Sequence, residues 1–106
     1  MFVRVVTFRL HGIDEGAYHE HAAAIAVRFN QWPGMKCKLW LSDPETGVYG
    51  GIYVFDSRAS ADASRQTAEF RGMLDNPAFT SLSIHDYGLI EDLTAVTAAW
   101  LSDRFA

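Results

Sequence analysis

The chain contains one cysteine, no run of basic residues and no long apolar stretch, and each scarcity excludes a class of protein. Cys37 has no second cysteine with which to form a disulfide or to begin a metal site. The formal net charge is −4 over 106 residues, whereas nucleic-acid binding needs a cationic surface. No apolar stretch has the length of a membrane span. We therefore expect neither a nucleic acid nor a membrane as a partner.

Targeting and cofactor motifs are scarce as well. Residues 1–9 break their apolar run with charge and have no small-residue cleavage site, so they indicate a first strand and we expect a cytoplasmic protein. No glycine-rich turn leads from a strand into a helix, so no flavin, nicotinamide or phosphate site is indicated. His19 and His21 lie in a segment with helical periodicity and point about 200° apart, which prevents them from sharing an ion. No other histidine or carboxylate has zinc-site spacing, and we predict no metal site.

Aromatic and apolar residues are plentiful instead. Hydrophobic residues make up 49% of the chain and aromatic residues 13%. Residues 1–106 are therefore interpreted as a single domain with a substantial core. The number of aromatic residues indicates a pocket wall or a subunit interface, with a well-packed core as the simpler alternative.

The periodicity and the turn signals predict the order β-α-β-β-α-β. This is the split β-α-β pattern of an α+β, ferredoxin-like fold with a four-stranded antiparallel sheet. The predicted elements are a strand over 2–10, a helix from Asp14 to Pro33, a hairpin over 34–56, a helix from Ser57 to Asn76 and a strand over 79–90.

Both predicted helices cover the same face of the sheet, and apolar residues on the opposite face need a cover. We therefore expect a homodimer that forms through the open sheet face. Residues 93–106 fit a short amphipathic tail, with Leu93, Val96 and Trp100 on one helical side and Phe105 beyond them. We expect this tail to pack on its own core or on the partner.

Three segments carry a resemblance to a known family: Asn30-Gln31-Trp32-Pro33-Gly34, Lys38-Leu39-Trp40 and Gly50-Gly51-Ile52-Tyr53-Val54-Phe55. Together they are similar to the YdhR-type monooxygenase family, a branch of the dimeric α/β-barrel superfamily that includes the antibiotic-biosynthesis monooxygenases. The resemblance extends over most of the chain. It implies a dimeric α/β barrel, and related enzymes deprotonate a phenol or anthrone whose carbanion then reacts with dioxygen. The glycine pair inside a strand separately indicates a bulge or a close approach by a ligand or another backbone.

Two histidines are candidate general bases, because imidazole exchanges protons near neutral pH. His21 lies at the edge of the apolar stripe of the first helix, and His85 alternates with Ser83 and Tyr87 on one face of the last strand. The alternative for each is a half-buried histidine bonded to a backbone carbonyl.

Five residues are candidates for substrate binding. Trp40, Tyr53 and Phe55 come from adjacent strands and could form a flat aromatic wall for a planar, apolar ligand, or they are core and dimer contacts. Asn30 and Trp32 occupy the Asn-Gln-x-Pro-Gly segment of the resemblance.

Three basic residues are also assigned. Lys36 and Lys38 are expected to point to solvent or to an interfacial carboxylate. Arg4, within a strand, needs a partner, which is Asp86 or an anionic ligand.

These observations leave three hypotheses for function. The first is a cofactor-independent monooxygenase or oxidoreductase acting on a small aromatic or polyketide-like compound. The second is a non-catalytic dimer that binds a small apolar molecule, and the third is a structural dimer with a filled core. No cofactor is expected. Haem, which some relatives in the superfamily bind or degrade, is the alternative, and the lack of a histidine between Ser57 and Asn76 disfavours it.

Overall fold

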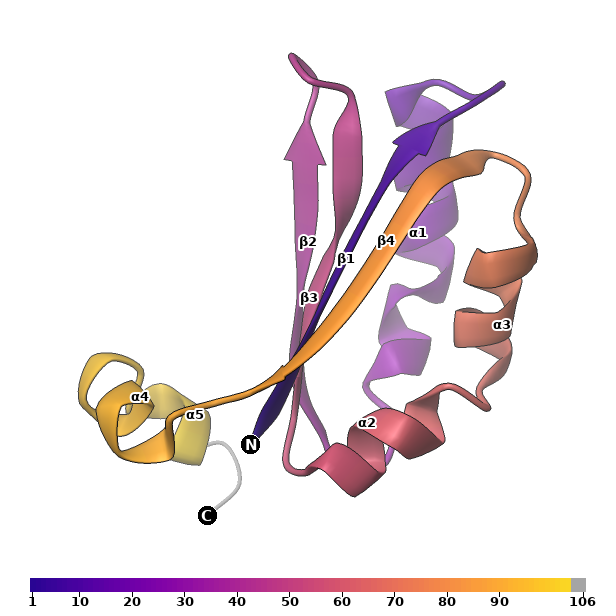
Figure 1. Ribbon diagram of the computed structural model, residues 1–106. Coiled ribbons are helices and arrows are strands. Elements are labelled where there is room, and N and C mark those ends of the chain that lie inside the picture. Colours follow the sequence, from indigo (N-terminus) through magenta and orange to yellow (C-terminus); the bar gives the residue numbers. More distant parts are fainter. Residues whose placement is uncertain (104–106) are drawn as a thin grey trace.

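Residues 1–103 are described by a computed structural model, in which a four-stranded antiparallel sheet carries three helices on one side (Figure 1). The strand order is β2-β3-β1-β4. This confirms the predicted α+β, ferredoxin-like fold and its antiparallel sheet. The elements in chain order are β1 (Phe2–Leu10), α1 (Glu15–Phe29), β2 (Met35–Asp43), β3 (Val48–Phe55), α2 (Arg58–Ser64), α3 (Ala68–Asp75), β4 (Phe79–Gly88), α4 (Glu91–Thr97) and α5 (Trp100–Asp103).

Side-chain caps set the beginnings of the helices. Asp14 caps α1, because its carboxylate accepts a hydrogen bond of 2.8 Å from the backbone N–H of Ala17. Ser57 caps α2 in the same way, through a bond of 3.1 Å from the N–H of Ser60. Both helix starts are as the sequence predicts.

The second predicted helix is in fact two helices. α2 ends at Ser64, and α3 begins after Thr67, whose hydroxyl accepts from the N–H of Phe70. The hydroxyl of Ser64 bonds back to the carbonyl of Ala61 at 2.6 Å. A single helix from Ser57 to Asn76 is therefore a wrong prediction, because the local cap at Thr67 starts a new helix.

Gly50 allows β1 and β3 to approach each other closely. Its φ is 154°, and a Cβ atom at this position would collide with the carbonyl oxygen of Val6 in β1. The register between β1 and β3 is continuous through the glycine pair. The pair therefore marks close approach of another backbone, one of the two predicted alternatives, and not a bulge between these strands.

A buried arginine ties β1 to β4 and α2. Arg4 is fully buried, and its Nε and Nη2 atoms donate to the two carboxylate oxygens of Asp86 at 2.8 and 3.0 Å. Its Nη1 and Nη2 atoms also donate to the Ser64 hydroxyl at 2.7 Å and to the Ala61 carbonyl at 2.9 Å. The predicted pairing with Asp86 is confirmed, and an anionic ligand is not needed to satisfy this guanidinium.

The opposite face of the sheet has no helix lying across it among the described residues, and the tail extends beyond one end of the strands (Figure 1). The tail forms two short helices, α4 and α5, in place of one, and residues 104–106, with Phe105, lie outside the described residues. Lys36 is buried and donates from Nζ to the carbonyl of Leu101 at 3.2 Å, which fixes α5 to β2. The expectation that Lys36 points to solvent is therefore wrong. No described helix is both long and apolar enough to span a bilayer.

Candidate functional site

The inner face of the sheet and the helices α1 and α3 enclose a cavity of about 210 Å³. Phe8 of β1 and Phe79 of β4 line it and stack on each other at 4.2 Å between ring centroids. The floor comes from β2 and β3, and the sides come from α1 and α3. Exposed lining residues, among them His21, Arg28 and Gly72, show that the cavity opens to solvent between the two helices. The site is therefore an apolar recess with an accessible mouth.

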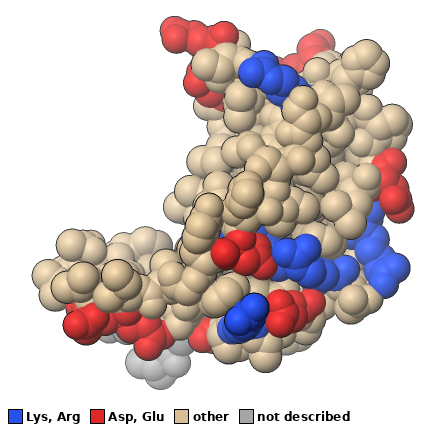
Figure 2. All heavy atoms as spheres, viewed as in Figure 1, with Lys and Arg blue, Asp and Glu red and all other residues tan. Residues whose placement is uncertain are grey.

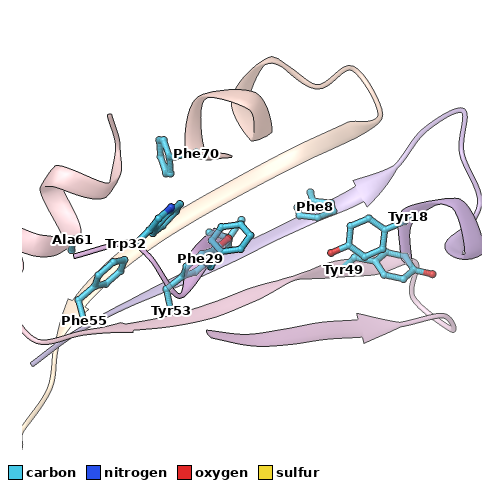
Figure 3. Close-up of a cluster of buried hydrophobic side chains, with 10 residues drawn as sticks. Phe8, Tyr18, Phe29, Trp32, Tyr49, Tyr53, Phe55, Ala61 and Phe70 are labelled. Atoms are coloured by element: carbon cyan, nitrogen blue, oxygen red, sulfur yellow. The ribbon is translucent and has the colours of Figure 1, made fainter. Parts of the chain in front are cut away.

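Three parallel rings form the wall near the end of the sheet (Figure 3). Trp32 lies 5.9 Å from Tyr53 and 6.5 Å from Phe55, with interplanar angles of 13° for both pairs. Tyr53 and Phe55 are themselves within 4° of parallel. Trp32 and Tyr53 line the cavity, whereas Phe55 is fully buried behind them. Trp40 is expected from the sequence to belong to this flat wall, but it lies outside the stack. Its ring crosses that of Phe29 at 82°, at the partly exposed rim of the cavity.

A hydrogen bond fixes the tryptophan of this wall. The indole Nε1 of Trp32 donates to the Glu69 carboxylate of α3 at 2.8 Å. Trp32 follows α1, so this bond joins the end of one helix to the first turn of the other. The Trp32 ring is thereby held in place without a partner from the cavity.

The two histidines lie on opposite faces of the sheet. His21 lines the cavity, and its ring meets Phe79 edge-on at 6.4 Å. His85 pairs in register with Val5 and lies on the open face, where its ring is 6.4 Å from that of Tyr87. Asn30 is the exposed C-cap residue of α1 and does not line the cavity. Of the two candidate bases, the structure brings only His21 to the recess formed by the described residues.

Lys38 is the functional candidate that sequence reasoning missed. Its Nζ atom lies 3.6 Å from the ring centroid of Phe29, 3.5 Å from that of Trp40 and 4.5 Å from that of Tyr53. It lines the cavity and does not point to solvent or to an interfacial carboxylate. One signal was available: Lys38 and Trp40 alternate in the strand and so share a face. The bulge between Met35 and Cys37 breaks that alternation and sends Lys36 the other way.

Burial shifts the proton equilibria of the cavity. Desolvation lowers the pKa of Lys38 to about 7. Desolvation raises the pKa of Tyr18 to about 12, and it also raises the pKa of Tyr53. Near neutral pH the two tyrosines therefore keep their hydroxyl protons, while the amine of Lys38 is close to its own midpoint.

The sequence as a whole matches a protein family. The family described as "Putative mono-oxygenase ydhR" matches residues 3–100, so the chain belongs to this family. No curated protein matches the chain.

Solved structures share the fold at low sequence identity. A "putative antibiotic biosynthesis monooxygenase" from Deinococcus radiodurans is 16% identical, with a TM-score of 0.71 over 84% of this chain and 92% of that one. A protein of unknown function from Nitrosomonas europaea is 17% identical, with a TM-score of 0.71 over 84% and 88%. The heme-degrader MhuD from Mycobacterium tuberculosis, solved with two hemes in its active site, is 14% identical, with a TM-score of 0.68 over 85% and 96%.

Haem does not fit the recess as it is shaped here. Sites for drug-sized ligands have volumes of about 300–1,000 Å³, and the recess of about 210 Å³ falls below that range. Stacked rings and the Trp32–Glu69 hydrogen bond hold the walls in place, so the small volume is a property of the packed side chains.

Proposed function

We propose that this protein is a cofactor-independent monooxygenase that oxidises a small, single-ring phenol or quinol bound between α1, α3 and the sheet. The observation that carries the proposal is the aromatic-lined recess in a chain of the ydhR family. A cavity of about 150 Å³ lined by apolar side chains suffices to bind benzene. A recess of about 210 Å³ suits one substituted ring, so polyketide-like compounds of several fused rings are too large.

The proposed reaction removes two protons from the substrate, one from the hydroxyl group and one from a ring carbon. It needs no external reductant. The hydroxyl proton leaves first, and the resulting anion reacts with dioxygen at a ring carbon. Loss of the hydrogen at that carbon, with cleavage of the O–O bond, leaves a quinone and one water. The stacked rings of Trp32 and Tyr53 would hold the substrate plane, and His21, which lines the mouth, would accept the carbon-bound proton.

The open sheet face is proposed to form a homodimer, as expected from the sequence. Leu39 of β2 and Tyr87 of β4 are exposed on this face. Ile90, Leu93 and Val96, at and within α4, are also exposed. In Figure 2 charged atoms lie at the two ends of the strands, including beside α2 and α4, and few lie along the strands between these ends. A second copy would cover this apolar surface and would enclose His85 in the interface.

The alternative is a dimer of the same fold that binds a small apolar molecule without turnover. One observation favours it: among the described residues, His21 has no hydrogen-bond partner that would orient its ring as a base. The two functions share the cavity and differ only in whether oxygen is consumed.

The test is a steric block at the mouth. Gly72 of α3 lines the cavity, and a Cβ atom there meets nothing within 4 Å. Gly72→Leu should fill the recess without unfolding the chain, whereas Gly16→Leu, in the first turn of α1 and away from the cavity, is the matched control.

Oxygen uptake and product mass would be measured with a panel of single-ring phenols and quinols. Uptake by wild type and Gly16→Leu, lost in Gly72→Leu, would support the oxygenase. His21→Ala should lower turnover by about 10²–10⁴-fold while binding persists, as expected for removal of a base. Binding without uptake across the panel would favour the binding protein.

A further inference from the structure

The half-buried amine of Lys38 lies in the recess without a counter-charge from the described part of the chain. Lys38 makes no ion pair with any carboxylate among residues 1–103. The acidic residue of the recess is Glu69, and its carboxylate is already bonded to Trp32. Lys38 is half-buried and partly desolvated, and holding a cation in such a place without an anion is costly. An anion that enters the recess would offset this cost.

The three rings around the amine attract its charged form and offset part of the cost of desolvating it. The Nζ atom lies 3.5–4.5 Å from the centroids of Phe29, Trp40 and Tyr53, within the range of cation–π attraction. These contacts hold the amine against the wall of the cavity. They neutralise no charge, and the remaining space beside the amine belongs to the ligand.

We propose that Lys38 binds the deprotonated form of a phenol or enol, and that it takes the hydroxyl proton itself when the amine enters the complex neutral. In that step the ligand O–H bond breaks and an N–H bond forms on Nζ, with no oxidant or reductant consumed. This inference rests on the proposed function for the location of the substrate, and it adds the group that ionises the substrate.

The bound state is the same whichever form the free amine has. A neutral amine with a phenol and an ammonium with a phenolate differ only in the position of one proton. Burial keeps the pKa of Lys38 near 7, so the neutral amine is available at neutral pH. A phenolate beside the ammonium supplies the missing counter-charge, and the surrounding rings accept the planar ligand.

The other titratable and charged groups of the recess leave this role to Lys38. Burial keeps Tyr18 and Tyr53 protonated, so they can donate to a phenolate but cannot take its proton. His21 and Arg28 lie exposed on α1, and Glu69 is bonded to Trp32.

The test uses para-nitrophenol, whose phenol and phenolate forms have different absorption bands. The apparent pKa of the bound ligand should fall by about one unit or more below that of the free ligand, which is roughly tenfold stronger binding of the phenolate. Lys38→Met should remove this shift. Lys36→Met should keep it, because Lys36 lies outside the cavity and contacts α5.

Para-nitroanisole, the methyl ether that cannot ionise, reports whether the cavity is intact. It should bind wild type and Lys38→Met with similar affinity. A bound para-nitrophenol that stays a phenol in wild type, or a shift that survives in Lys38→Met, would overturn the inference. Failure of both ligands to bind wild type would overturn the inference together with the proposed site. A Lys38-dependent shift in a protein that consumes no oxygen would support the inference and reject the monooxygenase.

Chemical labelling gives a second readout, because Lys36 and Lys38 are the only lysines in the sequence. At neutral pH, acetic anhydride should modify Lys38 by way of its neutral amine, and peptide mass spectrometry would separate the two sites. Saturating para-nitrophenol should protect Lys38 several-fold and leave Lys36 unchanged. Equal labelling of Lys38 with and without the ligand would contradict contact with the amine.

Discussion

Replacing Lys38 with methionine should stabilise the fold, and the gain should depend on pH. Burial lowers the pKa of Lys38 from 10.5 in a solvated chain to about 7 in the folded protein. Between these two values the unfolded chain holds a proton that the folded chain does not. The free energy of unfolding of the wild type therefore rises with pH across this window, by about 1.4 kcal/mol per pH unit.

The size of the effect follows from the same shift. Below pH 7 both states are protonated, and the full penalty applies, on the order of 5 kcal/mol from the shift in pKa alone. The cation–π contacts with Phe29, Trp40 and Tyr53 offset part of it, by about 0.5–2 kcal/mol. Methionine fits a similar volume and packs well against aromatic rings. We expect Lys38→Met to gain about 2–4 kcal/mol at acidic and neutral pH, and little above the window.

Urea unfolding at a pH below, within and above the window would measure this gain. Lys36→Met is the matched control: it removes the hydrogen bond to the Leu101 carbonyl and should lose stability. Two results would refute the reasoning. One is an equal pH slope for wild type and Lys38→Met between pH 7 and 10.5. The other is a loss of stability in Lys38→Met at neutral pH, which would mean that the amine has a partner in the fold.

Three further substitutions test the framework around the site. Asp86→Asn removes the charge opposite the buried Arg4 and should cost about 3–5 kcal/mol in thermal or urea unfolding. Burial acts to raise the pKa of Asp86, but its bonds to Arg4 and Arg65 hold it below the ordinary value. Wild-type stability should therefore fall as pH drops through that lowered pKa, and Asp86→Asn should lack this acid dependence. Gly50→Ala should cost at least about 1–3 kcal/mol, since its Cβ would strike β1, and an unchanged melting temperature would mean that the strands can separate there. Leu39→Asp on the open face should shift sedimentation toward a monomer without changing ring binding; a wild type that already sediments as a stable monomer would remove the dimer proposal.

Local signals account for the parts of the fold that the sequence predicts correctly. Asp14 and Ser57 cap their helices through bonds within three residues, so their effect can be recognised without the fold. The pairing of Arg4 with Asp86 is long-range, yet a strand arginine has few ways to satisfy its charge. The family resemblance also extends to most of the chain, and the family match over residues 3–100 agrees with it.

The candidate site could be predicted only in part, because its geometry depends on register and on packing between distant elements. Trp32 replaces Trp40 in the ring stack because it bonds to Glu69, which is 37 positions away. His85 lies on the face opposite the cavity because it pairs with Val5. A bulge before Cys37 gives the two lysines opposite environments, and nothing in the sequence marks that bulge.

Lys38 and the glycine pair become one feature once the structure places them together. A Cβ atom on Gly51 would lie 3.0 Å from Cε of Lys38, so the absence of a side chain at 51 leaves room for the lysine to reach the cavity. Glycine in a strand weakens the sheet, and a half-buried amine without an ion pair among residues 1–103 weakens the fold further. Packing alone would favour an apolar residue at 38, which would remove the cost of the amine. At 51 a Cβ atom would also lie 3.2 Å from the carbonyl oxygen of Leu39 and 3.3 Å from Cε1 of Tyr53, so the site has room only for glycine. Two destabilising residues that together deliver an amine to an aromatic recess are better explained by a ligand that needs the amine than by the requirements of the fold.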